Sequence, residues 1–271
     1  MPDILRFTDS HCHLDFDAFS ADLPSLLKQC QHASIHHIVI PTIGPANWLK
    51  ALALAKYHSS EHLTLHTCLG IHPWFLHDLM PDSLEALEHL VKLHLTDIVA
   101  IGETGIDVVI AQEQDNLAEQ KLVFEQQLTL AKNYNLPVIV HHRRSHQYIV
   151  PMLRQKQLAK GGIVHAFSGS YQQACQYIDL GFKLGIGGTI TYPRAEKTLK
   201  AIKRLPLESL VLETDAPAMP LYGFQGQDNS PLQLINIFQT LASIRREPST
   251  VLAHALESNI RAVLPRLVRA V

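Results

Sequence analysis

Short apolar segments rich in β-branched residues alternate with longer amphipathic segments along most of this 271-residue chain. The expected strands are Phe7–Leu14, His37–Ile43, Leu65–Ile71, Ile98–Glu103, Val138–His142, Gly162–Phe167, Phe182–Gly187 and Leu210–Thr214. The expected helices are Leu23–Ala33, Trp48–His58, Leu84–Leu95, Leu117–Tyr134, His146–Leu158, Tyr171–Leu180 and Lys197–Leu205. Strands that alternate with helices of this length predict βαβ units and a parallel sheet. About eight such units predict an α/β fold of the TIM (β/α)₈ barrel type.

The main rival is a doubly wound open sheet. That fold favours a Gly-rich phosphate loop after the first strand, and His11–His13 stands there instead. Strand centres such as Ile38–Ile40 and Val138–Val140 are continuously apolar, as expected for strands buried on both faces. Barrels of this length usually form one unit, so we expect a single domain over residues 1–271 with extra C-terminal helices from Pro231 onward.

Charge and cysteine content restrict the partners and the compartment. The formal net charge is -2, so no global basic excess exists to hold a polyanion, and a nucleic acid would be bound by a local patch or by metals. The N-terminus lacks the pattern of a signal peptide, and no apolar run reaches the length of a membrane span. The four cysteines form no C-x-x-C pair, which indicates reduced thiols. We expect a cytoplasmic protein without membrane contact, with a monomer favoured.

Polar side chains end several of the predicted strands. His11 and His13 end the first, and because side chains two residues apart point the same way, both imidazoles should project together while Cys12 points outward. The other strand ends carry Glu103, His141, His165 and Asp215. Each of these features alone is ordinary, since a His-x-His pair can lie in a turn and a Glu can cap a helix. Together they indicate one site, because the C-terminal strand ends of this barrel converge.

Four imidazoles and two carboxylates buried together require compensation, which metal ions supply. The set exceeds what one tetrahedral ion needs, so we expect two divalent metal cations with one bridging carboxylate. Zn²⁺, Mg²⁺ and Mn²⁺ all stay open as their identity. Such a pair clamps the attacking and leaving oxygens of a displacement and lowers the pKa of bound water, which predicts a hydrolase.

At these residues the sequence resembles the TatD family of metal-dependent hydrolases, within the amidohydrolase superfamily. The matching stretches run along nearly the whole chain: Asp9–Leu14, Gly70–Pro73, Gly102–Asp107, Pro137–Arg143, His165–Gly169 and Glu213–Pro217. Two further stretches, Gly187–Arg194 and Gly223–Gln227, are similar to the bacterial YjjV-like subgroup.

The resemblance implies two metals that share one carboxylate: His11, His13 and Asp215 at one metal, His141 and His165 at the other, and Glu103 bridging both. Asp215 and Glu103 are the implied catalytic residues, and Asp215 would also take a proton from the attacking water. His72 and Arg143 would lie near the substrate, where the rigid donor fork of arginine suits phosphate oxygens. Trp74 follows His72-Pro73, and loop packing is favoured over stacking on a base.

Two departures from the family concern the substrate. Val108 stands where relatives commonly have Tyr, and Asp228–Pro231 stands where many carry Arg-Asn-Glu-Pro. Neither change removes an implied metal ligand. Loops after the strands set specificity in this fold, so the changes bear on what is bound.

Three functions stay open on the sequence. The leading one is phosphodiester hydrolysis, with DNA as the substrate that the resemblance implies and thus a deoxyribonuclease activity. The second keeps the metals but acts on a small ester, amide, lactone, phosphotriester or phosphate-ester substrate. The third is a non-enzymatic metal-binding protein, and against it stands the absence of the thiolate ligands that structural zinc sites often use.

Overall fold

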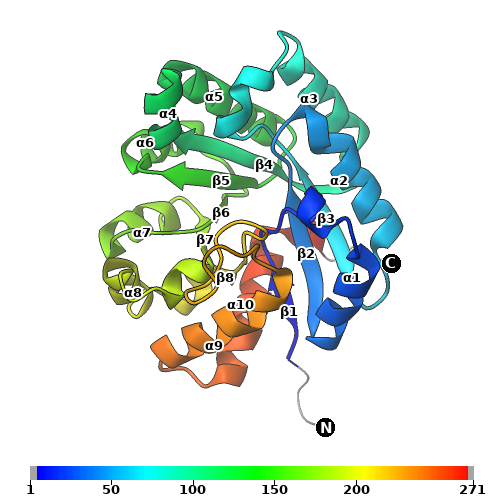
Figure 1. Ribbon diagram of the computed structural model, residues 1–271. Coiled ribbons are helices and arrows are strands. Elements are labelled where there is room, and N and C mark those ends of the chain that lie inside the picture. The colour runs from blue at the N-terminus through cyan, green and yellow to red at the C-terminus, as the bar shows by residue number, and fades with distance from the viewer. Residues whose placement is uncertain (1–4, 268–271) are drawn as a thin grey trace.

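Eight parallel strands, arranged in the order β1 to β8, form the centre of the molecule in a computed structural model that describes residues 5–267. The strands are β1 (Phe7–Asp9), β2 (Ile35–Pro41), β3 (Thr64–Leu69), β4 (Ile98–Asp107), β5 (Val138–Arg143), β6 (Gly162–Val164), β7 (Phe182–Ile186) and β8 (Leu210–Leu212). Each strand pairs with the next in parallel, and helices surround the strands (Figure 1). The prediction of a (β/α)₈ barrel is confirmed.

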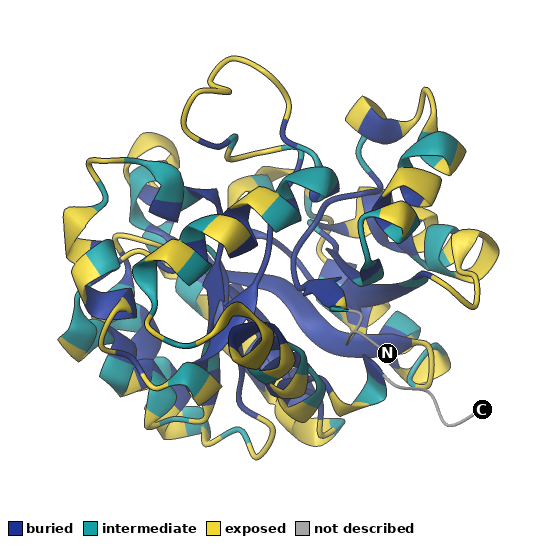
Figure 2. Ribbon diagram, turned by 90° about the horizontal axis from the view of Figure 1, so that it is seen from below, coloured by how far each residue is buried: buried dark blue, intermediate teal, exposed yellow. Residues whose placement is uncertain are grey.

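Seven of the eight helices between the strands agree with the amphipathic segments of the sequence, and the short helix Val108–Gln114 was not predicted. The helices between the strands are α1 (Leu23–His32), α2 (Pro45–His58), α3 (Ser83–Leu93), α4 (Val108–Gln114), α5 (Leu117–Asn133), α6 (His146–Lys156), α7 (Tyr171–Ile178) and α8 (Glu196–Ile202), followed by α9 (Leu234–Ile244) and α10 (Ser249–Val263). The last two are the extra C-terminal helices that the sequence predicts. Figure 2 shows buried strands at the centre and helices whose outer faces are exposed.

The apolar core has two layers. The larger layer lies between the strands and the surrounding helices. The smaller one fills the barrel interior, where Ile139, Ile163 and Val211 meet Ile260 of α10. Asn259 donates hydrogen bonds of 2.8 Å to the carbonyls of Leu207 and Leu210, at the beginning of β8. The end of α10 therefore closes the N-terminal end of the barrel.

Several strand boundaries differ from the predicted ones. The strands β1, β6 and β8 end before the predicted residues, so His11, His13, His165 and Asp215 follow their strands. After Asp9 the backbone bonds to both neighbours of β1, because Ser10 donates to Leu212 and Cys12 donates to Val39, and the regular ladder ends there. In contrast, β4 runs past Glu103 because Thr104 to Asp107 continue to pair with β5.

The seam between the first and the last strand is closed above the regular ladder. The amide of Asp215 donates to the carbonyl of His11 at 2.8 Å, and that of His13 donates to the carbonyl of Ala216 at 2.8 Å. The carboxylate of Asp9 joins the two segments, since it accepts the Thr214 amide at 3.0 Å and the Thr214 hydroxyl at 2.6 Å. Residues about 200 positions apart are thereby held side by side.

The structure tests in part the expectations that the protein has no membrane span and that its cysteines are reduced. None of the helices between residues 5 and 267 has the length and apolar character of a membrane span. All four cysteines are free thiols. The residues Met1–Ile4, which belong to the stretch compared with signal peptides, lie outside the described residues.

Truncation of the residue that closes the barrel tests this account of the core. We expect Ile260→Ala to lower the free energy of unfolding by roughly 2–5 kcal/mol, because the shortened side chain leaves a cavity in the barrel interior. Val251, on the same helix, is 49% exposed, so Val251→Ala should change it by less than about 0.5 kcal/mol. Urea denaturation of both variants measures the difference, and equal losses would contradict the packing described.

Candidate metal centre

The side chains of the candidate centre lie directly above the apolar barrel interior. Side chains two residues apart on a strand share a face, so His141 follows Ile139 inward, and His165 follows Ile163. Glu213 follows Val211 in the same way. The apolar layer below and the polar layer above therefore arise from one alternation, which continues past the ends of β6 and β8.

His11, His13, Asp215 and Glu103 form the first half of the centre. Nε2 of His11 lies 3.1 Å from Oε2 of Glu103, 3.4 Å from Oδ1 of Asp215 and 3.3 Å from Nε2 of His13. Nε2 of His13 lies 3.4 Å from the same Glu103 oxygen and 3.6 Å from the same Asp215 oxygen. The two imidazoles predicted to project together do so, although they follow the strand instead of ending it.

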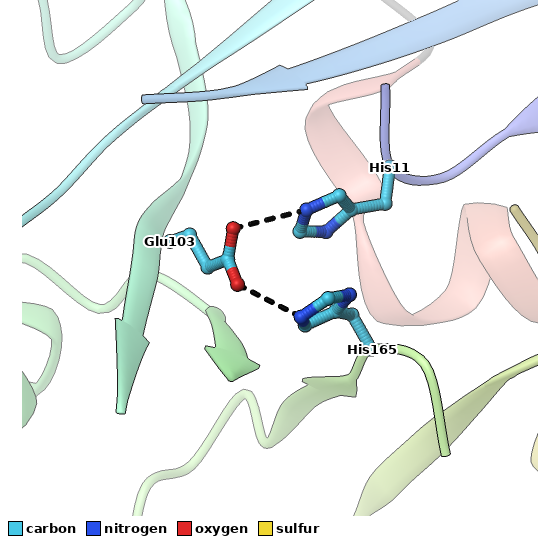
Figure 3. Close-up of side chains that lie close together, drawn as sticks. All are labelled: His11, Glu103 and His165. Carbon is cyan, nitrogen blue, oxygen red and sulfur yellow. Dashed lines mark hydrogen bonds and ion pairs between the residues drawn. The ribbon is translucent and has the colours of Figure 1, made fainter. Parts of the chain in front are cut away.

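The second oxygen of Glu103 faces the other half of the centre. Oε1 of Glu103 lies 2.9 Å from Nδ1 of His141 and 2.8 Å from Nε2 of His165. Figure 3 shows the Glu103 carboxylate with one oxygen toward His11 and the other toward His165. The structure thus brings all six predicted ligand side chains together, with Glu103 between the two halves.

The spacing of these atoms fits metal coordination. Ligand atoms about 2.1 Å from one ion are about 3.0–3.4 Å apart in octahedral or tetrahedral geometry. Three groups of side chains can each hold an ion, because the ligand atoms inside each group lie within 4.8 Å of one another. They are His11 with Glu103 and His165, His11 with His13 and Asp215, and His72 with Glu103 and His141. The donors are imidazole nitrogens and carboxylate oxygens without thiolate, a set suited to a divalent ion such as Zn²⁺.

His72, predicted to lie near the substrate, reaches the same pocket, but its hydrogen bonds make it a proton donor. Its Nδ1 accepts the backbone amide of Trp74 at 3.1 Å, so a neutral ring carries its proton on Nε2. That Nε2 lies 3.3 Å from Oε1 of Glu103. Burial lowers the pKa of His72 to about 4, so the ring is neutral near pH 7. With Nδ1 occupied by the Trp74 amide, the proton stays on Nε2, and this nitrogen donates a hydrogen bond where the unprotonated form would be a metal ligand.

Asp107 orients His141, a role that the sequence analysis missed. Its Oδ2 accepts Nε2–H of His141 at 3.1 Å and the indole N–H of Trp74 at 2.6 Å, which leaves Nδ1 of His141 free to face Glu103. Its Oδ1 caps α4 by accepting the amides of Val109 and Ile110. The available signal was strand alternation, because Asp107 lies four residues after Glu103 on β4. Trp74 therefore has a positioning contact beyond loop packing.

Glu213 supports the segment that carries His165. Its Oε1 accepts the backbone amide of Ala166 and lies 3.8 Å from Nδ1 of His165. A Cβ atom at Gly185 would lie 2.0 Å from Oε2 of Glu213, so a larger residue at this strand position would displace the Glu213 carboxylate. Burial raises the pKa of Glu213 to about 8. Glu213 therefore braces the segment that carries His165, on the side away from Glu103.

A cavity of about 470 Å³ opens over the centre, lined by Glu103, His141 and Asp215 together with Trp74 and Arg143. Arg143, predicted to contact the substrate, lies at the margin with a half-exposed side chain, and its Nη1 is 3.9 Å from Oδ2 of Asp107. Because Arg143 lines the cavity together with Glu103, His141 and Asp215, an anion bound there can reach both the arginine and the predicted metal ligands. The roles predicted for His72 and Arg143 stay predictions.

Carboxylates and imidazoles in the pocket shift one another's pKa. Burial opposes the charged form of His13, but hydrogen bonds to Asp215 and Glu103 outweigh it and raise the pKa to about 10. For His165, burial is likewise outweighed by Glu103, and the pKa rises to about 9. Burial also opposes ionisation of Glu103, but the surrounding imidazoles, His165 first, hold its pKa well below the usual value. Protons thus occupy positions where cations are expected to bind.

A (β/α)₈ barrel with imidazoles and carboxylates gathered at its C-terminal mouth defines the class of metal-dependent barrel hydrolases. Comparison with known proteins specifies the family. The model of the TatD-related DNases matches residues 8–265. The chain belongs to this family, which confirms the resemblance seen in the sequence.

Two relatives and one solved structure cover nearly the whole chain. YjjV, an uncharacterised metal-dependent hydrolase of Escherichia coli K12, is 44% identical over 256 residues, which are 94% of this chain and 96% of YjjV. An uncharacterised metal-dependent hydrolase of Haemophilus influenzae is 38% identical over 252 residues, 92% of this chain and 95% of the relative. The crystal structure of the Escherichia coli YjjV, a TatD homologue, superposes with a TM-score of 0.91 at 43% identity and covers 96% of this chain and 98% of that one.

The protonation of the centre gives a first test. Because neighbouring carboxylates raise the pKa of His13, His141 and His165, metal binding should release at least about two protons per loaded protein, and metal affinity should rise with pH between about 7 and 9. Isothermal titration of metal into the protein in Tris and in PIPES, buffers that differ in ionisation enthalpy, counts the protons. Binding heats that do not depend on the buffer would contradict this electrostatic account.

The contact of Asp107 with His141 gives a second test. We expect Asp107→Asn to weaken metal binding by about 10–100-fold, because an amide N–H facing Nε2 of His141 moves the ring proton to Nδ1. Asp115→Asn, an exposed carboxylate at the other end of α4, serves as the matched control. Competition with a chromophoric chelator measures affinity, and thermal unfolding checks the fold. Unchanged affinity in Asp107→Asn would show that His141 is not oriented in this way.

Proposed function

We propose that the protein hydrolyses phosphodiester bonds with two divalent cations, and that single-stranded DNA is its substrate. The proposal rests on the position of Glu103, whose two carboxylate oxygens face two different sets of imidazoles. His11, His13 and Asp215 would hold one cation, and His141 and His165 the other. Imidazole nitrogen favours Zn²⁺ over Mg²⁺, which prefers oxygen ligands. A cytoplasmic, monomeric protein stays a prediction.

Bound cations supply the Lewis acidity that makes water nucleophilic at neutral pH and offsets the phosphate charge. The side chains supply the remaining steps. Asp215, held as a carboxylate by its histidine neighbours, accepts the proton of the attacking water. His72 donates Nε2–H, and Arg143 its guanidinium N–H groups, to phosphate oxygens. The closed barrel below the centre keeps bulk water away from the back of the pocket.

DNA as the substrate is supported by the family and by local charge. The net charge of -2 gives no long-range attraction, so binding would depend on Arg143 and on the cations. Trp74, which lines the pocket and is 39% exposed, offers a stacking surface for an unpaired base. Both features suit a single strand better than a duplex.

A small phosphate diester is the second candidate, favoured by the loop between β8 and α9. Asp228–Pro231 lacks the arginine and glutamate common in the family, and Asn229 is buried there. Its Nδ2 donates to the carbonyls of Thr214 and Met219 and so holds the loop in place. This loop therefore offers a substrate fewer charged contacts than it would in relatives with the commoner motif.

Substitution of the two central carboxylates tests the mechanism. We expect Asp215→Asn and Glu103→Gln to lower kcat/KM at least about 100-fold on single-stranded DNA and on bis(p-nitrophenyl) phosphate, because each change removes a proton acceptor or a bridging ligand. Asp82→Asn and Glu119→Gln, both exposed, are the controls. Assays run after chelation and readdition of Zn²⁺, Mn²⁺ or Mg²⁺. Wild-type rates in both central variants would exclude the mechanism, and hydrolysis of the small diester alone would favour the second candidate.

A further inference from the structure

A second cavity adjoins the pocket over the metal centre. It encloses about 490 Å³, within the roughly 300–1,000 Å³ range of ligand-binding pockets. Ser168 and Met219 line both cavities, so one hollow leads from the metal ligands toward Tyr192 and Arg194. The proposed hydrolysis at the metals uses no residue of this far end.

The far end combines a cation with aromatic rings. The guanidinium of Arg194 lies 5.0 Å from the centre of the Tyr192 ring. Arg194 is exposed and forms no ion pair within residues 5–267, so its donors are available to an anion. The ring of Tyr222, 56% exposed, meets that of Tyr192 edge to face at 5.7 Å. Arginine planes and aromatic faces are the groups on which unpaired bases stack.

Hydrogen bonds hold these walls in place. The hydroxyl of Tyr192 donates to the carbonyl of Pro220 at 2.8 Å, and the amide of Tyr222 donates to the hydroxyl of Thr191 at 2.8 Å. The loop between β8 and α9 is thereby joined to the end of the 3-10 helix Gly188–Thr191 and to Tyr192, which follows it. A ligand entering the cavity finds a surface already formed, which reduces the ordering cost of binding.

We propose that this cavity is a nucleotide subsite, in which Tyr192, supported by the ring of Tyr222, holds the nucleoside beside the scissile phosphate and Arg194 binds the next phosphate. The inference rests on the proposed function and specifies its substrate as a chain of nucleotides. A small diester fills only the cavity over the metals. A nucleotide chain, with its alternating bases and phosphates, matches a tyrosine followed by a guanidinium that has no carboxylate partner within residues 5–267.

Ligands that contain no diester separate this subsite from hydrolysis. Thymidine 3′,5′-bisphosphate carries a phosphate on each side of one nucleoside, the two thymidine monophosphates each lack one of them, and inorganic phosphate lacks the nucleoside. Each is titrated calorimetrically into the metal-loaded full-length protein. We expect the bisphosphate to bind about 10-fold more tightly than the better monophosphate, and that monophosphate about 10-fold more tightly than phosphate.

Two variants address the two parts of the subsite. Arg194→Gln should abolish the advantage of the bisphosphate over the monophosphate, with Arg154→Gln on the exposed face of α6 as control. Tyr192→Leu should abolish the advantage of the monophosphate over phosphate. Tyr192→Phe keeps the ring and loses only the bond to Pro220, so it should keep the advantage of the monophosphate over phosphate that Tyr192→Leu loses. In both subsite variants, KM for oligothymidylate should rise about 10-fold, while hydrolysis of bis(p-nitrophenyl) phosphate stays within about twofold.

The outcomes distinguish the subsite from the proposed function. Equal binding of the bisphosphate, the monophosphates and phosphate to wild type would overturn the subsite. Equal losses on the small diester and on oligothymidylate would overturn it as well, since the variants would then act on the metal centre. If wild type hydrolyses neither substrate, the proposed function fails, and the calorimetric order of affinities still decides whether the nucleotide subsite exists.

Discussion

The hydrogen bonds that close the barrel between β1 and β8 are the constraint on which the centre depends. His11 and His13 lie near the beginning of the chain and Asp215 near its end, and their backbones bond to each other directly. The Asp9 carboxylate joins the same segments through Thr214. Three predicted ligands therefore share one backbone framework, so their relative positions follow from closure of the barrel and not from loop conformation.

The same framework explains why polar groups are tolerated in the barrel interior. Below the seam, Ile139, Ile163 and Val211 exclude water, and two residues further along the inward positions become polar. At that level Glu103 is buried among imidazoles whose protons offset its charge. Positive charge is required there to balance the negative charges of Glu103 and Asp215. Metal cations that displace the histidine protons would also balance these charges, and they would fix the positions of the ligand side chains.

Much of this arrangement could be predicted from the sequence. Alternation of strands and helices indicated the barrel, and the polar residues that follow the apolar runs indicated which side chains meet. Strand boundaries were wrong where tertiary bonding replaces the ladder, as after Asp9, or prolongs it, as from Thr104 to Asp107. The contacts of Asp107 with Trp74 and His141, and the tautomer of His72, depend on the path of the loop after β3, which no local pattern encodes.

The strand ends and the connecting loops thus have different roles in this protein. Positions on or just beyond the strands hold the groups that any hydrolysis at the centre needs, and the sequence stretches that resemble the family include these positions. The departures lie in connecting segments, at the first residue of α4 and in the loop from Ala216 to Ser230. That loop is hydrogen-bonded to Thr191 and Tyr192. A change in either segment can therefore reshape the second cavity, which contains none of the predicted metal ligands. Substrate choice can therefore change while the chemistry is retained.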